Sequence, residues 1–479
     1  VVNDSAWNFL KSNIPFFECP DKNIELTYYF RWWTYRKHIK LTPDGFVITE
    51  FLPVVSWSGK QNTIGCPVEH HFREGRWLRD PKYLNDYANF WIYHSGIQQR
   101  GDKTWPHVLD HGNPLAASFY NFFMVHPQKD FHLDRLSELV GFYEELKSRR
   151  KTEVPLYWSL DGSPLGDGME IAIGGPGVRP TINSYLFAQA KAISEFSKLA
   201  GLSEQAEKYR KEAESIKKNM VNYLWDEESS FFKVLRFGNL EEKELAGNRN
   251  LADVRELIGF IPWLYNIPPK GEGYEKAWLQ LMDPEGFFAS YGPTTAEQRH
   301  PDFMISYSGH ECQWNGPSWP YATSQTLTSL ANVLNNYPQN YISKEDYFTI
   351  LSIYSKSHQI IKDNGSIVPW IDENLNPYTG DWIARTRLKS NNSKTERGKD
   401  YNHSTFADLI ITGLIGLRPR NDNVIEINPL IPENGWDWFC LDGIYYKGQN
   451  LSIIYDRYGK KYNKGKGLML IINDEIVLH

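Results

Sequence analysis

Residues 182–220 read INSYLFAQAKAISEFSKLAGLSEQAEKYRKEAESIKKNM, and this stretch decides the fold class. Its apolar side chains recur every three to four residues, first along 182–199 and again along 206–220, which is the spacing of one face of an α-helix. Gly201 is placed to end the first helix, and Ser203 is placed to cap the second. The two segments therefore predict an antiparallel helical hairpin.

Similar helical periodicity recurs on both sides of this hairpin, from about residue 80 to residue 418. We expect further helices over 82–99, 111–125, 131–150, 252–266, 273–282, 318–337, 344–362 and 404–418. The intervening loops are long and rich in Gly, Pro, Trp and Asn, and long loops on a helical scaffold usually carry function. Helical hairpins of unequal length are what a toroid of paired helices would give, although no sequence repeat of fixed period is visible.

The pattern changes after Leu417. Short β-branched or aromatic runs bounded by Asn, Asp and Gly predict strands over 424–427, 443–446, 451–455 and 468–472. We therefore divide the chain into an N-terminal segment (1–60), a helical body (61–418) and a C-terminal β-sheet module (419–479). The sequence stops at 476–479 without a terminating loop, which favours a longer natural chain.

Composition excludes several classes of protein. With 479 residues, 41% hydrophobic and 23% charged, the chain is too long for a small module and apolar enough to fold. A net charge of -6 without a basic cluster argues against a nucleic-acid partner. No window approaches the roughly 18 consecutive apolar residues of a membrane span. The oligomeric state stays open.

The aromatic residues and the cysteines give further information about the ligand and about the state of the thiols. The 25 Phe, 17 Trp and 28 Tyr favour a carbohydrate ligand, because flat apolar rings with a polar edge suit sugar rings, although a large core also uses aromatics. The four scattered cysteines favour free buried thiols, with one bridge left open. The first residues do not read as a secretion signal, and this terminus does not decide the compartment; we expect a periplasmic or secreted location rather than a cytoplasmic one.

Three loops join ionisable groups to aromatics. The first, 157–170, places Asp161, Asp167 and Glu170 in a Gly-rich run beside Trp158, where an apolar wall could raise the pKa of a general acid. The alternative for this loop is a turn in which Asp caps its neighbours.

The second loop, 310–320, makes a stiff ledge that could stack on a sugar ring and hydrogen-bond its hydroxyls. Its candidate sugar contacts are Gln313, Trp314, Asn315 and Trp319. Trp158 and Asp167 of the first loop and Trp370 of the third are further candidates. The third loop, 368–381, carries Trp370 and a second set of carboxylates that includes Glu373. Hydrolysis of a glycosidic bond needs an acid and a base on opposite faces of the sugar, and these loops could supply them.

The three loops resemble, in the same order, those of trehalases and of glycoside hydrolase family 63, which includes processing α-glucosidases and mannosylglycerate hydrolases. Residues 313–320 are similar to the Gln-Trp-Asp-x-Pro and Trp-Ala-Pro signature, residues 160–164 to the general-acid loop Trp-Asp-x-Ser-Pro, and residues 373–380 to the loop that begins with the general base. The resemblance implies a mainly α-helical (α/α)6 toroid, with short β-rich N- and C-terminal elements. It also implies inverting hydrolysis, with Asp161 as the acid and Glu373 as the base.

The departures from that pattern favour a substrate other than trehalose. Leu165 stands where an Arg often follows Ser-Pro, Leu375 replaces the usual Tyr, and Asp167 stays a rival acid. We expect an α-linked glucoside or mannoside, or an oligosaccharide end. Two alternatives stay open: a non-catalytic glycan-binding barrel and an inverting glycoside phosphorylase.

The first hairpin of six-hairpin glycosidases commonly lines the substrate pocket, which by resemblance adds Glu50, Trp57, His70 and Arg76 to the candidate sugar contacts. The pair His70-His71 lacks a third ligand at zinc-like spacing, so we predict no catalytic metal and no cofactor. A structural calcium ion on loop carboxylates stays open. The sequence contains no nucleotide-binding fingerprint and no serine-hydrolase elbow.

Overall fold

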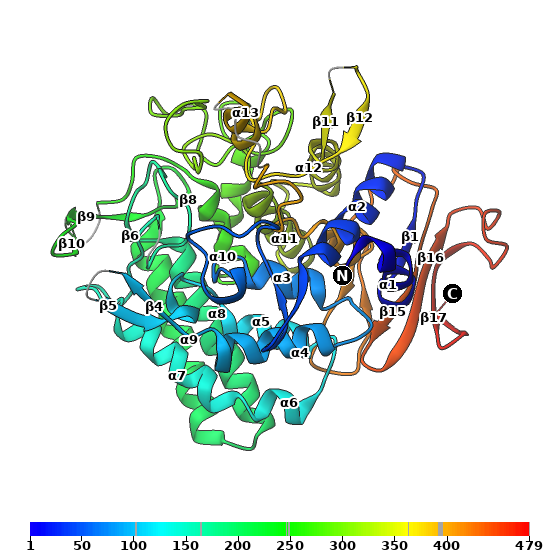
Figure 1. Ribbon diagram of the computed structural model, residues 1–479, viewed down its shortest axis with the longest axis horizontal. Helices are drawn as coiled ribbons and strands as arrows, with labels where there is room; N and C mark the ends of the chain where they lie inside the picture. The colour runs from blue at the N-terminus through cyan, green and yellow to red at the C-terminus, as the bar shows by residue number, and fades with distance from the viewer. Residues whose placement is uncertain are drawn as a thin grey trace.

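The computed structural model describes residues 1–100, 103–162, 165–245, 247, 250–362, 364–390 and 396–478. It is mainly helical, with a β-sheet at one side and short β elements near the N-terminus (Figure 1). The helices are α1 (Ala6–Asn13), α2 (Lys22–His38), α3 (Val68–Gly75), α4 (Lys82–Asn89), α5 (Leu115–Phe123), α6 (Lys129–Leu133), α7 (Leu136–Ser148), α8 (Pro180–Leu199), α9 (Ser203–Leu224), α10 (Ile261–Leu264), α11 (Pro320–Asn336), α12 (Lys344–Ser357), α13 (Ile383–Ser390) and α14 (Phe406–Asp408).

Short helical segments of 3₁₀ or π type complete this part of the molecule. They are η1 (Asn3–Ser5), η2 (Lys60–Asn62), η3 (Phe90–His94), η4 (His107–Leu109), η5 (Leu257–Phe260), η6 (Tyr274–Leu281) and η7 (Leu409–Leu414). The strands are β1 (Phe16–Glu18), β2 (Ile39–Thr42), β3 (Gly45–Ile48), β4 (Ile97–Arg100), β5 (Lys103–Pro106), β6 (Gly177–Val178), β7 (Trp225–Asp226), β8 (Phe231–Phe232), β9 (Leu235–Asn239), β10 (Glu244–Leu245), β11 (Gln359–Ile361), β12 (Ile367–Pro369), β13 (Leu417–Arg418), β14 (Glu426–Ile427), β15 (Trp438–Tyr446), β16 (Gln449–Asp456), β17 (Gly467–Ile472) and β18 (Glu475–Leu478).

The predicted hairpin over 182–220 is confirmed as α8 and α9, which pack closely against each other. Gly201, with φ +76°, allows the left-handed turn that ends α8. The predicted cap at Ser203 is wrong, because Ser203 is the first helical residue and Leu202 takes the cap position without a side-chain hydrogen bond.

Other predicted helices differ in length from the sequence pattern. The predicted helix over 82–99 ends at His94, because residues 97–100 form β4 of a hairpin. The segment 252–266 contains only η5 and one turn of α10, and 273–282 forms the 3₁₀ segment η6. Pro262 lies in the first turn of α10, where proline is tolerated, and Pro268 follows α10, where proline cannot continue a helix.

Neighbouring helices contact one another in a regular succession. Helix α3 packs against α5, α5 against α8, α8 against α10, α10 against α11, and α11 against η7, while α14 contacts α3. Helices α7 and α9 lie against α8, and α12 lies against α11. The toroid stays a prediction, because the structure does not directly show a closed barrel.

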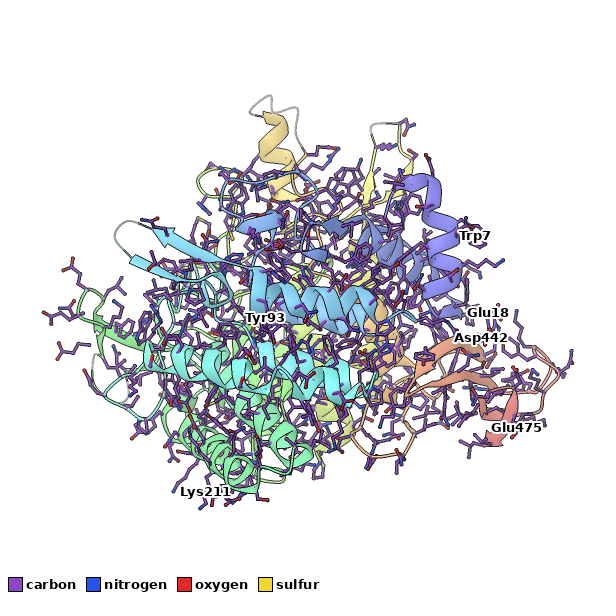
Figure 2. All side chains as sticks on the ribbon, turned by 60° about the horizontal axis from the view of Figure 1, so that its bottom comes forward. Trp7, Glu18, Tyr93, Lys211, Asp442 and Glu475 are labelled. Carbon is purple, nitrogen blue, oxygen red and sulfur yellow. The ribbon has the colours of Figure 1, made fainter. Side chains whose placement is uncertain are left out.

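The C-terminal strands form one five-stranded antiparallel sheet in the order β1-β15-β16-β17-β18. The predicted strands over 443–446, 451–455 and 468–472 lie in β15, β16 and β17, whereas only residues 426–427 of the segment 424–427 form a strand, β14, which pairs with β13 in a separate sheet. Strand β1 comes from the N-terminal segment and pairs with β15, so Glu18 and Asp442 lie near each other (Figure 2). Leu441 and Ile453 of the sheet are buried in the same core as the helices.

Two further findings concern the whole chain. In the part of the chain that the structure describes, no helix is long and apolar enough to cross a membrane. The four cysteines carry no disulfide bond. Cys19 is buried, whereas Cys66, Cys312 and Cys440 are partly exposed, so the expectation of buried free thiols holds only for Cys19.

Candidate active site

A cavity of about 300 Å³ opens where the loops before the helices α3, α8 and α11 meet the segments around 373 and 397–403. Its volume is at the lower end of the usual range for small-molecule sites. Its wall combines acids, aromatic rings, imidazoles, one guanidinium and two thiols: Glu50, Glu170, Glu311, Glu373, Trp57, Trp314, Trp319, Tyr321, Tyr401, His111, His310, His403, Arg397, Cys66 and Cys312.

Glu373, the predicted base, lies in this wall. Its Oε1 atom is 3.1 Å from Nε of Arg397, whose Nη1 also contacts Oε1 of Glu311 at 2.8 Å. Burial raises the pKa of Glu373 to about 6, although Arg397 acts in the opposite direction. Backbone hydrogen bonds between Ser318 and Leu375 fasten the third loop to the second, which fixes the position of this carboxylate.

Glu50 lies in the same wall and has two polar neighbours. Tyr401 Oη donates to Glu50 Oε1 at 3.1 Å, and His403 Nε2 lies 2.7 Å from the same oxygen. Burial raises the pKa of Glu50 to about 7 and lowers that of His403 well below its usual value. His403 is therefore neutral at neutral pH, and the contact joins a carboxyl group to an uncharged imidazole.

The aromatic side of the cavity is built by the second loop. The rings of Trp314 and Trp319 stack with their centroids 4.6 Å apart and an angle of 17° between the planes. Trp319 Nε1 donates to the carbonyl oxygen of Gln313 at 2.7 Å, which holds the stack in place. The partly exposed Trp57 lies opposite Arg397, whose guanidinium is 5.1 Å from its ring centroid.

The three acids of the first loop take different positions. Asp167 is buried and ion-paired to Arg179, with Oδ2 2.7 Å from Nε, and it also accepts a hydrogen bond from Thr181. Asp161 is half-buried outside the cavity lining, and its Oδ1 accepts a hydrogen bond from the backbone N–H of Gly162. Glu170 is the acid of this loop that lines the cavity. Residues 163–164 of the resembling motif lie outside the described residues.

Several predicted sugar contacts lie behind the cavity wall. His70 is buried, with its ring stacked on Tyr321 at 3.9 Å. Gln313 is used inside its own loop, where its Nε2 donates to the carbonyls of Ser306 and His310. Asn315 is also buried, and its backbone carbonyl accepts a hydrogen bond from the backbone N–H of Met304. None of these three residues lines the cavity.

The remaining predicted contacts lie elsewhere. Trp158 is buried beneath Arg150 and Lys243. Trp370 lies under two other cationic side chains, outside the lining of this cavity. Arg76 is ion-paired to Asp408 at 2.7 Å and lines a different cavity. Of the thirteen predicted site residues, the structure thus brings Glu50, Trp57, Trp314, Trp319 and Glu373 together.

Sequence reasoning missed Arg397, Tyr401, His403 and Glu311. Glu311 and Glu170 stood inside loops already singled out, so the polar-aromatic composition of those loops was a usable signal. Arg397 follows a segment rich in Lys and Arg without periodicity, and no pattern there marks it. Among the described residues, no group of three or more His, Cys, Asp or Glu is arranged to hold a metal ion.

Two family models match this chain. Residues 60–404 match the family model of the mannosylglycerate hydrolase MGH1-like glycoside hydrolase domain. The chain belongs to this family. Residues 417–479 match the C-terminal domain of glycosyl hydrolase family 65. The predicted resemblance to six-hairpin glycosidases, and to an enzyme that cleaves glycosidic bonds, is therefore confirmed for this MGH1-like domain.

Several solved structures similar to the MGH1-like chain bear glycosidase names. One named "Sialidase" is 42% identical, with a TM-score of 0.88, and the match covers 99% of this chain. The chain spans only 41% of the length of that protein. A family 63 mannosylglycerate hydrolase from Thermus thermophilus, solved with glucose, is 12% identical with a TM-score of 0.52, covering 80% of this chain and 99% of its own. A family 78 rhamnosidase from a Bacillus species is also 12% identical, with a TM-score of 0.58, covering 96% and 41%. The last two show a shared fold alone.

Proposed function

We propose that this domain is an inverting glycosidase that removes a neutral sugar from the end of a glycoside, with Glu373 as the general base. The observation that carries the proposal is the position of Glu373: a buried carboxylate in the wall of a sugar-sized cavity that a stacked Trp pair also lines. With a pKa of about 6, Glu373 is ionised at neutral pH and basic enough to draw a proton from water.

The acid partner comes from the first loop. We assign it to Glu170, because this side chain lines the cavity with Oε2 only 3.4 Å from Nε2 of the exposed His310. The backbone N–H of Trp314 donates to the carbonyl of Glu170 at 3.1 Å, which joins this acid to the aromatic side. Asp161 stays the prediction of the loop motif, and Glu50 is already engaged by Tyr401 and His403.

In this mechanism Glu170 protonates the glycosidic oxygen as its bond to the anomeric carbon breaks. Glu373 takes a proton from a water molecule, whose oxygen bonds to the anomeric carbon from the opposite face. A single displacement of this kind inverts the anomeric configuration. Support for inversion comes from the resemblance of both loops to those of inverting six-hairpin enzymes.

The charges of the wall favour a neutral sugar. Four carboxyl groups line the cavity, and Arg397, the one lining guanidinium among the described residues, is already paired with Glu311 and Glu373. A sugar carboxylate would enter this wall without a free guanidinium to pair with, and an unpaired buried charge is costly. We therefore propose that this cavity binds neither a sialic acid, as the name of the longer relative would suggest, nor a glycerate group, as the family name would suggest.

We propose that α3, α5, α8, α10, α11 and the α14–η7 segment form the inner ring of an (α/α)6 toroid. The succession of contacts supports this, since each of these elements touches the next and α14 returns to α3. The loops that carry Glu170, Trp314 and Glu373 would then meet at one end of the ring.

A glycoside panel tests the function. The protein is incubated with α- and β-linked nitrophenyl glycosides of glucose, mannose and other neutral sugars, with natural oligosaccharides, and with the corresponding uronides. We expect release of a neutral sugar, with the product anomer opposite to the substrate anomer in proton NMR spectra recorded at early times. Binding without release would support a non-catalytic glycan-binding barrel, and release only in the presence of phosphate would support a phosphorylase.

The acid is identified by leaving-group rescue. Removing the general acid has little effect on the rate when the leaving group needs no proton, as in 2,4-dinitrophenyl glycosides. We expect Glu170→Gln to lose activity on the natural glycoside but keep it on the dinitrophenyl substrate, whereas Asp161→Asn retains both. The reverse pattern would transfer the role to Asp161, and rescue in Glu50→Gln alone would transfer it to Glu50.

A further inference from the structure

A second cavity, of about 290 Å³, lies among the same helices but farther along them. Helix α11 shows the separation, because its residue Tyr321 lines the candidate active site whereas Asn332 lines the second cavity. At 1.5 Å per residue, these positions are roughly 16 Å apart along the helix. The two cavities are therefore distinct sites.

The described wall of the second cavity is basic. Arg73, Arg76, Lys191 and Arg418 line it, and no Asp or Glu does. Two of the four cations form ion pairs with acids that do not line the cavity: Arg73 pairs with Glu69 and Arg76 with Asp408, each at 2.7 Å.

The other two cations have no ion pair among the described residues. The Arg418 guanidinium donates to the Thr412 carbonyl and to Asn332 Oδ1, both uncharged acceptors. Lys191 makes no hydrogen bond or ion pair within the described part of the chain. Lys191 is exposed, and desolvation lowers its pKa, whereas the nearby Glu195 acts in the opposite direction.

Helix ends explain part of this charge but not all of it. Cations near the last turn of a helix are favoured by the helix dipole, and Arg73 stands in the last turn of α3. Lys191 lies in the interior of α8, more than one turn from Leu199, where that effect has faded. Lys191 and Arg418 therefore place two cations without an ion-pair partner among the described residues beside this cavity, although Glu195 and Glu214 act on Lys191 from a longer distance.

We propose that this second cavity binds a small organic anion, a carboxylate or a phosphate ester, with its charged group between Lys191 and Arg418. Charge-assisted hydrogen bonds to an oxyanion are stronger than those to a neutral group, so the two side chains would select for charge. Phe187, Leu264 and Tyr120 supply an apolar wall for a ring or a short carbon chain. Arg76, which the sequence predicted for substrate binding, would then serve this site.

Isothermal titration calorimetry with the full chain tests the proposal, using inorganic phosphate, glucose 6-phosphate, D-galacturonate and neutral glucose as probes. We expect at least one anion to bind, more weakly as sodium chloride is added. We expect Lys191→Gln to weaken that binding about tenfold. The matched control is Lys198→Gln on the same helix, because Lys198 is exposed and paired with Glu195; it should bind as the wild type does.

Two further measurements separate the possible results. Glu373→Gln should keep the wild-type affinity for the anion, because Glu373 belongs to the other cavity. The proposal is overturned if no anionic probe binds, if glucose binds at the second cavity as tightly as the anions, or if Lys191→Gln leaves the affinity unchanged. The ratio of the phosphate to the galacturonate affinity then distinguishes the two sources of oxyanion.

Discussion

Glu373 and Arg397 together set the pH at which the cavity can work. Burial disfavours the charged carboxylate and raises its pKa, whereas the neighbouring guanidinium favours the charged form. The result, a pKa of about 6, keeps Glu373 ionised at neutral pH. A general base must be ionised, so activity should rise with pH through about 6 and then level off on that limb.

Removing the guanidinium should move this limb. In Arg397→Gln the carboxylate loses its stabilising charge, so the pKa of Glu373 rises and the acidic limb of the kcat profile shifts to higher pH. The measurement is kcat between pH 4 and 9 on the cognate glycoside. The control is Arg385→Gln, whose side chain pairs with Glu396 outside the cavity lining and should leave the profile unchanged. An unmoved limb in Arg397→Gln would refute the coupling.

Asp167 illustrates how a loop acid can serve structure instead of chemistry. Its carboxylate pairs with Arg179 and accepts from Thr181, both at the start of α8, and both charged side chains are fully buried. In Asp167→Ala the Arg179 charge is left buried without its partner, which should lower the free energy of unfolding by about 3–5 kcal/mol.

Urea denaturation measures that change. The matched control is Asp253→Ala, because Asp253 is largely exposed in its pair with Arg236 and should cost less than about 1 kcal/mol. Equal midpoints for the two variants would show that the buried pair does not hold the first loop to α8.

At the scale of the elements, helix α12 begins with a capping box. Ser343 Oγ accepts from the backbone N–H of Asp346, and the Asp346 carboxylate accepts from the backbone N–H of Ser343. These two side-chain acceptors satisfy backbone N–H groups that have no partner within the helix. The motif therefore stabilises α12 and, through packing, the neighbouring helix α11.

The change Ser343→Ala should lower the free energy of unfolding by about 1 kcal/mol, measured by urea denaturation. Ser203→Ala is the control, because Ser203 begins α9 without a side-chain cap and should have a much smaller effect. If both variants unfold at the same urea concentration as the wild type, the cap contributes nothing to stability.

At the scale of the whole molecule, periodicity predicted the long helices α8, α9, α11 and α12 and most of the C-terminal strands, because both follow from local sequence spacing. It missed α2, a 17-residue helix in the N-terminal segment that was expected to be β-rich. It could not predict that β1 joins β15, since that pairing unites residues 16–18 with 440–442. It also overestimated the α-helix content of 252–266, which holds only η5 and one turn of α10, and of 273–282, which forms the eight-residue 3₁₀ segment η6.

The candidate site was predictable in part for the same reason. The composition of the three loops pointed to Glu373, Trp314 and Trp319, which line the cavity. Which acid of the first loop faces the cavity depends on the turns of that loop. Asp161 accepts a hydrogen bond from the backbone N–H of Gly162, Asp167 pairs with Arg179, and Glu170 lines the cavity. Spacing along the sequence carries no information about such turns.

The kcat of Glu373→Gln on the cognate neutral glycoside tests the central claim most directly. The amide keeps the shape of the side chain but cannot accept a proton from water, so we predict a loss of about 10³-fold in a protein with an unchanged circular dichroism spectrum. A folded Glu373→Gln variant that turns over at the wild-type rate would contradict the account.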